Sequence, residues 1–117
     1  MLTSSDARVL AATNVASSVE EQVVALAKLA EASNLDGVVA SSLEVQLIRA
    51  AIPRSNFLIV TPGVRPYGAD RGDQRRVMTA TEALRAGSDY LVIGRPIIEA
   101  DDPVRAALAI LVEMENA

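Results

Sequence analysis

Three short, mainly apolar runs constrain the fold of this chain more than any other feature of its sequence. They are 35–40 (LDGVVA), 57–61 (FLIVT) and 89–93 (DYLVI). Their apolar residues are nearly continuous instead of alternating with polar ones, which is typical of parallel strands buried on both faces. Segments with helical periodicity separate the runs, so the sequence predicts an α/β fold whose parallel sheet is covered by helices.

Helix signals lie between and after these strands. Ser18, Ser41 and Thr79 are each followed three residues later by a glutamate, the pattern of a capping box at a helix N-terminus. Pro53 and Gly87 are expected to end the second and third helices. The expected helices are 18–33, 41–52, 79–86 and 103–115. Two apolar stripes at helical spacing are Val19, Val23, Leu26 and Ala30 in the first helix and Val104, Leu108 and Leu111 in the last.

Composition excludes several function classes. Half of the 117 residues are hydrophobic, enough for a single domain, 1–117, with its own core. The formal net charge of −4 argues against general binding to nucleic acid or to anionic membranes. The chain has no cysteine, no signal-peptide pattern and no apolar segment near the ~20 residues that span a bilayer, so a cytoplasmic setting is expected.

The residue types that are missing also limit the catalytic and metal-binding chemistry that the chain can perform. The chain has no histidine, and its only lysine, Lys28, lies off the apolar stripe of the first helix, where a solvated position is expected. Asp and Glu residues are scattered along the chain instead of paired. Catalytic candidates are therefore limited to carboxylates, and no metal site is expected.

The second and third strand runs end in the same manner. Gly63 and Arg65 follow the second run, and Gly94 and Arg95 follow the third. A glycine lets the backbone approach an anion, and a guanidinium can close over the anion with two hydrogen bonds. Because ligands of parallel α/β proteins bind at the carboxyl ends of the strands, these residues predict a phosphate site.

The loop 62–78 is long for a strand-to-helix connection, which usually has about 2–6 residues. It contains four arginines and Gln74, an unusual supply of anion donors in an acidic chain. On these residues alone, a ligand-binding loop and a solvated excursion with its charges in water both stay open.

Four segments together resemble the carboxyl-terminal half of bacterial orotidine 5′-phosphate decarboxylase. They are 35–41 (LDGVVAS), 60–66 (VTPGVRP), 72–79 (GDQRRVMT) and 89–97 (DYLVIGRPI), in the order and spacing of that family. The family folds as an eight-stranded β/α barrel and converts orotidine monophosphate to uridine monophosphate, a step of pyrimidine biosynthesis, without metal or organic cofactor. The resemblance implies the carboxyl-terminal half of a (β/α)8 barrel, from the end of the fifth strand to the eighth helix.

The resemblance also implies site residues. Arg65, Gln74, Gly94 and Arg95 match positions that bind the substrate phosphate, and Thr3 matches a hydroxyl residue that touches the pyrimidine. Orotidine or uridine monophosphate, bound through its phosphate, is the expected partner.

The catalytic residues of the family have no match in this chain. The family's alternating lysine–aspartate array belongs to the second and third strands, which would precede Met1. Tyr67 also departs from the pattern, since relatives often carry glutamine there.

Two functions stay open: a decarboxylase part that is inactive without an amino-terminal half, and a phosphomonoester-binding half-barrel that does no chemistry. Sugar-phosphate decarboxylases and hexulose-phosphate synthases share the phosphate site, but the match over 61–74 favours the orotidine enzyme.

A half-barrel is also expected to associate with another polypeptide. Its first and last strands have unpaired edges, and its inner face, expected at Val38, Leu58, Val60, Leu91 or Ile93, stays partly uncovered. The isolated chain is therefore expected to form a two-fold dimer that closes a barrel-like sheet, or larger aggregates, unless a missing amino-terminal half covers it.

Overall fold

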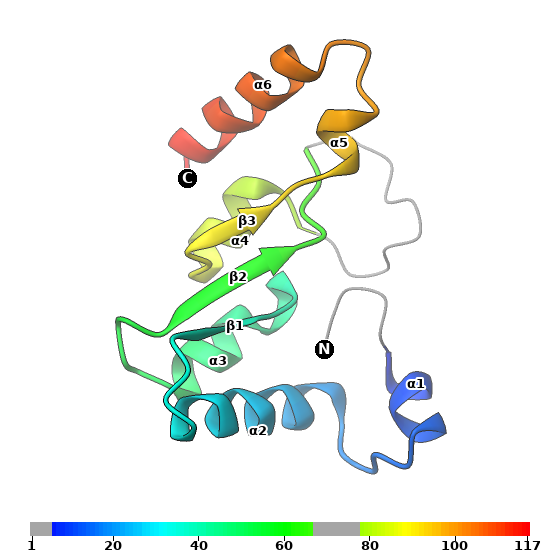
Figure 1. Cartoon of the computed structure of the whole chain (residues 1–117), viewed down its shortest axis with the longest axis vertical. Coiled ribbons are helices and arrows are strands. Elements are labelled where there is room, and N and C mark those ends of the chain that lie inside the picture. The colour runs from blue at the N-terminus through cyan, green and yellow to red at the C-terminus, as the bar shows by residue number, and fades with distance from the viewer. Residues whose placement is uncertain (1–5, 67–77) are drawn as a thin grey trace.

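Helices alternate with the strands of a parallel sheet in the computed structural model, which describes residues 6–66 and 78–117 (Figure 1). The elements are α1 (Ala7–Ala12), α2 (Val19–Ala32), β1 (Gly37–Val39), the 3₁₀ turn η1 (Ser42–Glu44), α3 (Val45–Ala51), β2 (Leu58–Pro62), α4 (Ala80–Ala86), β3 (Tyr90–Val92), α5 (Arg95–Ile98) and α6 (Pro103–Glu115). The expected strands and helices are present at their expected places, whereas α1 and α5 were not predicted.

The strands form one sheet in the order β1-β2-β3, and both pairings are parallel. Val39 lies beside Val60, and Val60 lies beside Tyr90 on the next strand. Helices connect the successive strands, as parallel neighbours require. The predicted α/β fold with parallel strands is therefore confirmed.

Two of the predicted capping boxes are confirmed. At α2 the N–H of Glu21 donates to the Ser18 hydroxyl at 3.1 Å, and the Ser18 N–H donates to the Glu21 carboxylate at 3.0 Å. Thr79 and Glu82 make the same reciprocal pair at α4. Gly87 ends α4 with a φ of 109°, a conformation that favours glycine.

The capping box predicted at Ser41 is wrong. The Ser41 side chain makes no capping hydrogen bond, and its hydroxyl is fully buried without a hydrogen-bond partner. The chain tightens here into η1, and the N–H of Glu44 donates to the carbonyl of Ser41 at 3.0 Å. That backbone bond uses the amide that the hydroxyl would have needed, so a 3₁₀ turn precedes α3.

Helix α1 begins at the Asp6 carboxylate. This group accepts hydrogen bonds from the N–H of Arg8 at 3.0 Å and of Val9 at 3.2 Å. The hydrogen bond from Val9, followed by that from the Arg8 side chain, lowers the pKa of Asp6. Leu10 is buried in the core and attaches α1 to the rest of the chain.

Two clusters of buried side chains hold the helices on one face of the sheet. In the first, α2 and α3 pack against Phe57 and Ile59, which are fully buried. In the second, Ile110 of α6 packs with Ala83 of α4 and with Val64. These clusters join α2, α3, α4 and α6 to the same side of the strands.

The predicted apolar stripe of α6 does not face this core. Val104, Leu108 and Leu111 are 53–70% exposed, whereas Ile110, on the side toward α4 and α5, is buried. No described part of the chain covers the outer side of α6. The stripe of α2 is only partly buried, because Leu26 is 44% exposed.

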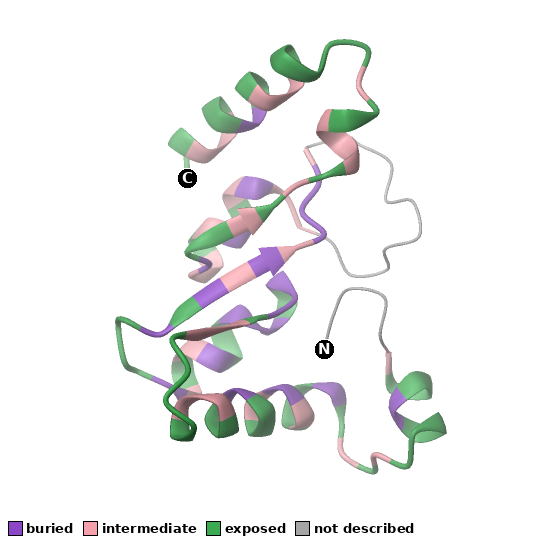
Figure 2. Ribbon diagram, in the orientation of Figure 1, coloured by how far each residue is buried: buried purple, intermediate pink, exposed green. Residues whose placement is uncertain are grey.

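None of the helices in residues 6–66 and 78–117 lies on the opposite face of the sheet (Figure 2). We call it the open face, and it consists of Val39, Leu58, Val60, Tyr90 and Val92. Leu58 and Val60 were expected here, but Val38, Leu91 and Ile93 instead pack against the helix-side clusters. Successive strand residues point to opposite faces, so a shift of one residue accounts for the error.

Gly37 lies where the backbones of β1 and β2 approach closely. A Cβ atom added there would lie 2.1 Å from the carbonyl oxygen of Leu58. We expect Gly37→Ala to lower the free energy of unfolding by about 2–3 kcal/mol, because one strand must move away. Urea unfolding followed by circular dichroism measures this loss. Gly94→Ala is the matched control, since an added Cβ meets nothing within 4 Å at that position; equal losses in both variants would contradict the explanation.

Candidate functional site: an arginine-lined pocket at the strand ends

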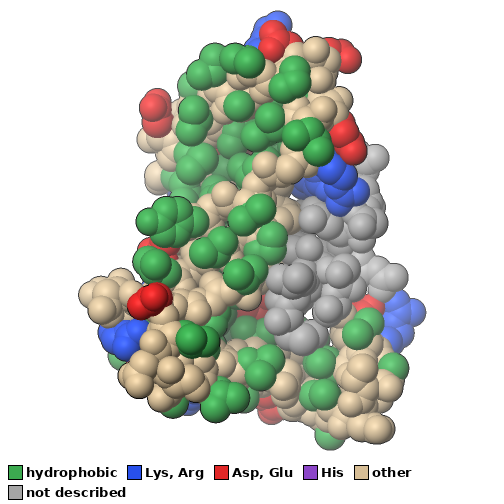
Figure 3. All heavy atoms as spheres, in the orientation of Figure 1, with side chains coloured by type: hydrophobic (Ala, Val, Ile, Leu, Met, Phe, Trp, Pro, Cys, Tyr) green, Lys and Arg blue, Asp and Glu red, His purple; other side chains and the backbone are tan. Residues whose placement is uncertain are grey.

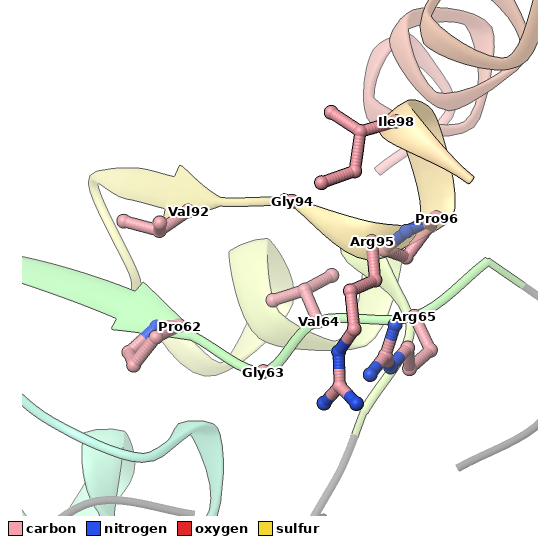
Figure 4. A pocket seen from close by; sticks show the side chains of 9 residues that line it. All are labelled: Pro62, Gly63, Val64, Arg65, Val92, Gly94, Arg95, Pro96 and Ile98. Atoms are coloured by element: carbon pink, nitrogen blue, oxygen red, sulfur yellow. The ribbon is translucent and has the colours of Figure 1, made fainter. Parts of the chain in front are cut away.

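A pocket of about 290 Å³ lies at the carboxyl edge of the sheet, where β2 and β3 end (Figure 4). It is lined by Pro62, Gly63, Val64, Arg65, Val92, Gly94, Arg95, Pro96 and Ile98. Because β2 and β3 are parallel neighbours, the segments that follow them start side by side. This topology brings two segments about thirty residues apart in sequence into one site.

The segment after β2 holds Arg65 in a defined place. Gly63 has a φ of 74°, a left-handed conformation that turns the chain at the end of the strand. Val64 is buried with Ala80 of α4 in the second core cluster. The N–H of Arg65 then donates to the carbonyl of Met78 at 3.1 Å, and the residue is 8% exposed. These contacts fix the backbone from which the guanidinium extends.

The segment after β3 is fixed by a short helix. The carbonyl of Gly94 accepts hydrogen bonds from the N–H of Ile97 at 2.9 Å and of Ile98 at 3.1 Å, which start α5. The backbone of Gly94 has a φ of −110°, and an added Cβ would meet no atom within 4 Å. Packing within the described chain therefore does not require glycine here, and its missing side chain leaves space beside Arg95.

The pocket concentrates positive charge in an acidic chain. Arg65 and Arg95 extend to the same side of the pocket, and Figure 4 shows their guanidinium groups close to each other. Two guanidinium groups that line one pocket attract an anion. Guanidinium groups match a phosphate or a carboxylate with paired hydrogen bonds. The pocket is therefore suited to a small anion.

Among the residues that the structure describes, those that line the pocket offer no group for proton transfer. The lining residues include no carboxylate, histidine or lysine. Lys28 lies on α2 with its side chain in solvent. Within residues 6–66 and 78–117, no group of three or more histidine, cysteine, aspartate or glutamate side chains could hold a metal ion. The described site can bind and orient a ligand, but it holds no acid or base.

Three of the five predicted site residues meet at this pocket. Arg65, Gly94 and Arg95 line it together, whereas Thr3 and Gln74 lie outside the described residues. Most of the loop 62–78, including Tyr67, also lies outside them. Sequence reasoning missed Ile98, because its place in the lining depends on α5, a helix of only four residues that no strong sequence signal announces. None of the helices that the structure describes is long and apolar enough to cross a membrane.

Comparisons with known proteins identify the family. The orotidine 5′-phosphate decarboxylase / HUMPS family matches residues 1–110. The orotidine 5′-phosphate decarboxylase of Trichlorobacter lovleyi is 57% identical over 114 residues, which cover 97% of this chain and 47% of that protein. The corresponding protein of Moorella thermoacetica is 64% identical over 97 residues, covering 83% of this chain and 38% of that protein.

A solved structure gives the same result for the fold. The crystal structure of orotidine 5′-phosphate decarboxylase from Lactobacillus acidophilus is similar over 100% of this chain and 47% of its own, with a TM-score of 0.78 and 41% identity. The chain spans about half the length of the curated relatives it matches first, in agreement with the predicted half of a β/α barrel. This chain belongs to the orotidine 5′-phosphate decarboxylase / HUMPS family.

Proposed function

We propose that this chain is the phosphate- and pyrimidine-nucleotide-binding half of a cytoplasmic orotidine 5′-phosphate decarboxylase, and that it needs an amino-terminal half for catalysis. The observation that carries the proposal is the pairing of Arg65 and Arg95 in one pocket at the strand ends. Membership of the family supports orotidine monophosphate as the substrate of the complete protein.

The size of the pocket suits part of a nucleotide. Its volume of about 290 Å³ is at the lower limit of the ~300–1,000 Å³ that whole small-molecule sites occupy. The phosphate would lie between Arg65 and Arg95, and the ribose and base would extend along the carboxyl edge of the sheet. Val92 lines the pocket and also belongs to the open face, so it lies on that path. Gln74 is proposed to contact the phosphate and Thr3 the pyrimidine.

Arg95→Ala tests the phosphate site. Loss of a charge-assisted bidentate contact removes about 1.5–3 kcal/mol, so uridine monophosphate should bind about ten- to a hundredfold more weakly. Calorimetric titration of the folded chain measures the dissociation constant. Arg105→Ala on α6 is the control, because Arg105 is exposed and does not line the pocket, and its affinity should not change. Unchanged affinity in Arg95→Ala would refute this role.

Gly94→Ala is a second variant for the same calorimetric titration. Its methyl group would project into open space and leave stability nearly unchanged. A phosphate that approaches the Gly94 backbone would meet that methyl group, so uridine monophosphate should bind more weakly. Loss of binding together with retained stability separates a ligand role from a structural one.

A phosphomonoester-binding module without chemistry is the second candidate, because the described residues that line the pocket include no carboxylate, histidine or lysine. Titrating the amino-terminal half of a family member into the chain separates the two functions. Recovery of orotidine monophosphate decarboxylation supports the enzyme part. A stable complex that binds uridine monophosphate but never turns over orotidine monophosphate supports the binding module. Preference for ribose 5-phosphate over uridine monophosphate would instead favour the sugar-phosphate branch of the superfamily.

A further inference from the structure

Glu113 on α6 holds the first turn of α4. Its Oε1 accepts a hydrogen bond from the N–H of Ala80 at 3.1 Å, and its backbone carbonyl accepts one from the Thr81 hydroxyl at 2.8 Å. The first N–H groups of a helix have no partner within the helix. At α4 the Thr79 hydroxyl satisfies the N–H of Glu82. The N–H of Ala80 instead depends on Glu113, so the start of α4 is fixed to α6.

The first turn of α4 is in turn connected to Arg65. Met78 stands two residues before Ala80, and its carbonyl accepts the N–H of Arg65 at 3.1 Å. Val64, the residue before Arg65, is buried in one cluster with Ala80 and with Ile110 of α6. A movement of the first turn of α4 therefore moves the backbone from which the Arg65 guanidinium extends.

Arg95 is attached to α6 by a different route. It is the first residue of α5, which packs against α6, and Ile97 of α5 contacts the cluster that contains Ile110. Figure 3 shows Lys and Arg side chains at the surface beside α5, so an anion can reach this part of the molecule. Helix α6 therefore supports both arginines of the pocket, one through α5 and the other through the start of α4.

We infer that Glu113 is a positioning residue of the anion site. It acts on Arg65 through the segment 78–80 and places the Arg65 guanidinium beside that of Arg95. The inference rests on the proposed function of the arginine-lined pocket as a phosphate site. Glu113 does not line the pocket, so it has no contact with the ligand. A guanidinium forms paired hydrogen bonds with a phosphate only in a narrow geometry, so a small shift of Arg65 lowers the affinity.

Calorimetric titration of Glu113→Ala with uridine monophosphate tests this role. The dissociation constant should rise about three- to tenfold, because the N–H of Ala80 loses its acceptor and the first turn of α4 shifts. Glu113→Gln should retain most of the affinity, since its carboxamide oxygen can still accept that hydrogen bond. Glu115→Ala is the matched control, because it removes the same charge from an exposed position of the same helix, and it should leave the affinity unchanged.

A double-mutant cycle with Arg65→Ala separates positioning from a general loosening of the fold. In the Arg65→Ala background, Glu113→Ala should change the affinity little further, because the side chain that Glu113 positions is absent. A merely structural role would instead weaken binding as much in that background as in the unaltered chain. Urea unfolding of each variant gives the folded fraction, to which the affinity is referred. Thr81→Val removes only the hydroxyl contact with α6 and replaces Glu113→Ala in the cycle if that variant does not fold.

The outcomes distinguish this inference from the proposed function. Binding that Arg95→Ala weakens but Glu113→Ala does not would overturn the positioning role alone. An effect of Glu113→Ala that persists in full without the Arg65 side chain, or an equal effect of Glu115→Ala, would also overturn it. An unaltered chain that binds no uridine monophosphate would overturn the phosphate site and the positioning role together.

Discussion

The isolated chain is expected to convert no orotidine monophosphate to uridine monophosphate above background between about pH 5 and pH 9. The resemblance to orotidine 5′-phosphate decarboxylase implies that decarboxylation needs a lysine that delivers a proton and aspartates that alternate with it. The only lysine, Lys28, lies on α2 in solvent, and the described lining of the arginine pocket contains no carboxylate, histidine or lysine. The pocket is suited to a small anion, but its described lining supplies nothing for the proton transfer.

The assay requires chain purified from a host that lacks its own decarboxylase, with decay of orotidine monophosphate absorbance as the readout. Adding the amino-terminal half of a family member should restore turnover, and Arg95→Ala in the same mixture should reduce it by raising the KM. Turnover that follows the purified chain without any added half would contradict the expectation. It would require a catalytic role for a carboxylate such as Asp36, next to the start of β1.

Local signals made much of the fold predictable. The pairs Ser18–Glu21 and Thr79–Glu82 each satisfy two backbone N–H donors within one turn, so their effect does not depend on distant residues. Gly87 likewise ends α4 through its own φ. The strands were predictable because their runs are short, apolar and bounded by turn residues.

Features that depend on packing were not predictable in the same way. Ser41 stands at the sequence position of a helix cap, but its hydroxyl is buried and makes no capping hydrogen bond, because the tight turn η1 forms there. Val38 and Val39 are identical in type, and only the packing of the helices determines which one faces solvent. The stripe of Val104 and Leu108 on α6 is amphipathic in sequence, but periodicity does not reveal whether a partner for it lies within the chain.

The candidate site could be predicted because the same sequence pattern occurs twice. Arg65 and Arg95 each follow a strand and a glycine, and adjacency of two parallel strands was enough to predict that they meet. The exact lining was not predictable, because Ile98 enters it through α5 and Val64 is anchored by a distant residue of α6, Ile110.

Arg49 joins four segments at the edge of the sheet opposite the pocket. From α3, its Nε and Nη2 donate to the carbonyl of Gly87 at 3.0 and 2.7 Å, and its Nη1 donates to the carbonyl of Phe57 at 2.6 Å. Its guanidinium also pairs with Asp89, whose carboxylate accepts the N–H of Ile59 at 2.7 Å. One side chain thus connects α3 to the start of β2, the end of α4 and the start of β3.

Arg49→Met should lower the free energy of unfolding by about 2–4 kcal/mol, since it removes the guanidinium donors of two backbone carbonyls and one of the donors to the Asp89 carboxylate. That is a large share of the ~5–15 kcal/mol that stabilises a typical domain. The side chains of Arg49 and Asp89 are 25% and 32% exposed, so solvent will replace part of the lost interaction and the lower end of the range is favoured. Urea unfolding, followed by circular dichroism at fixed chain concentration, gives the change.

Arg85→Met is the matched control for Arg49→Met. Arg85 also lies on a short helix, α4, but it is exposed and donates only long hydrogen bonds, at 3.3 and 3.4 Å, to carbonyls at the end of the chain. Its replacement should change the free energy of unfolding by less than about 0.5 kcal/mol. Arg49→Lys should recover only part of the loss, because one ammonium group cannot reach two carbonyls and a carboxylate in the planar geometry of a guanidinium. Equal stability of the Arg49→Met and Arg85→Met variants would mean that packing of the apolar clusters alone holds α3 and α4 to the sheet.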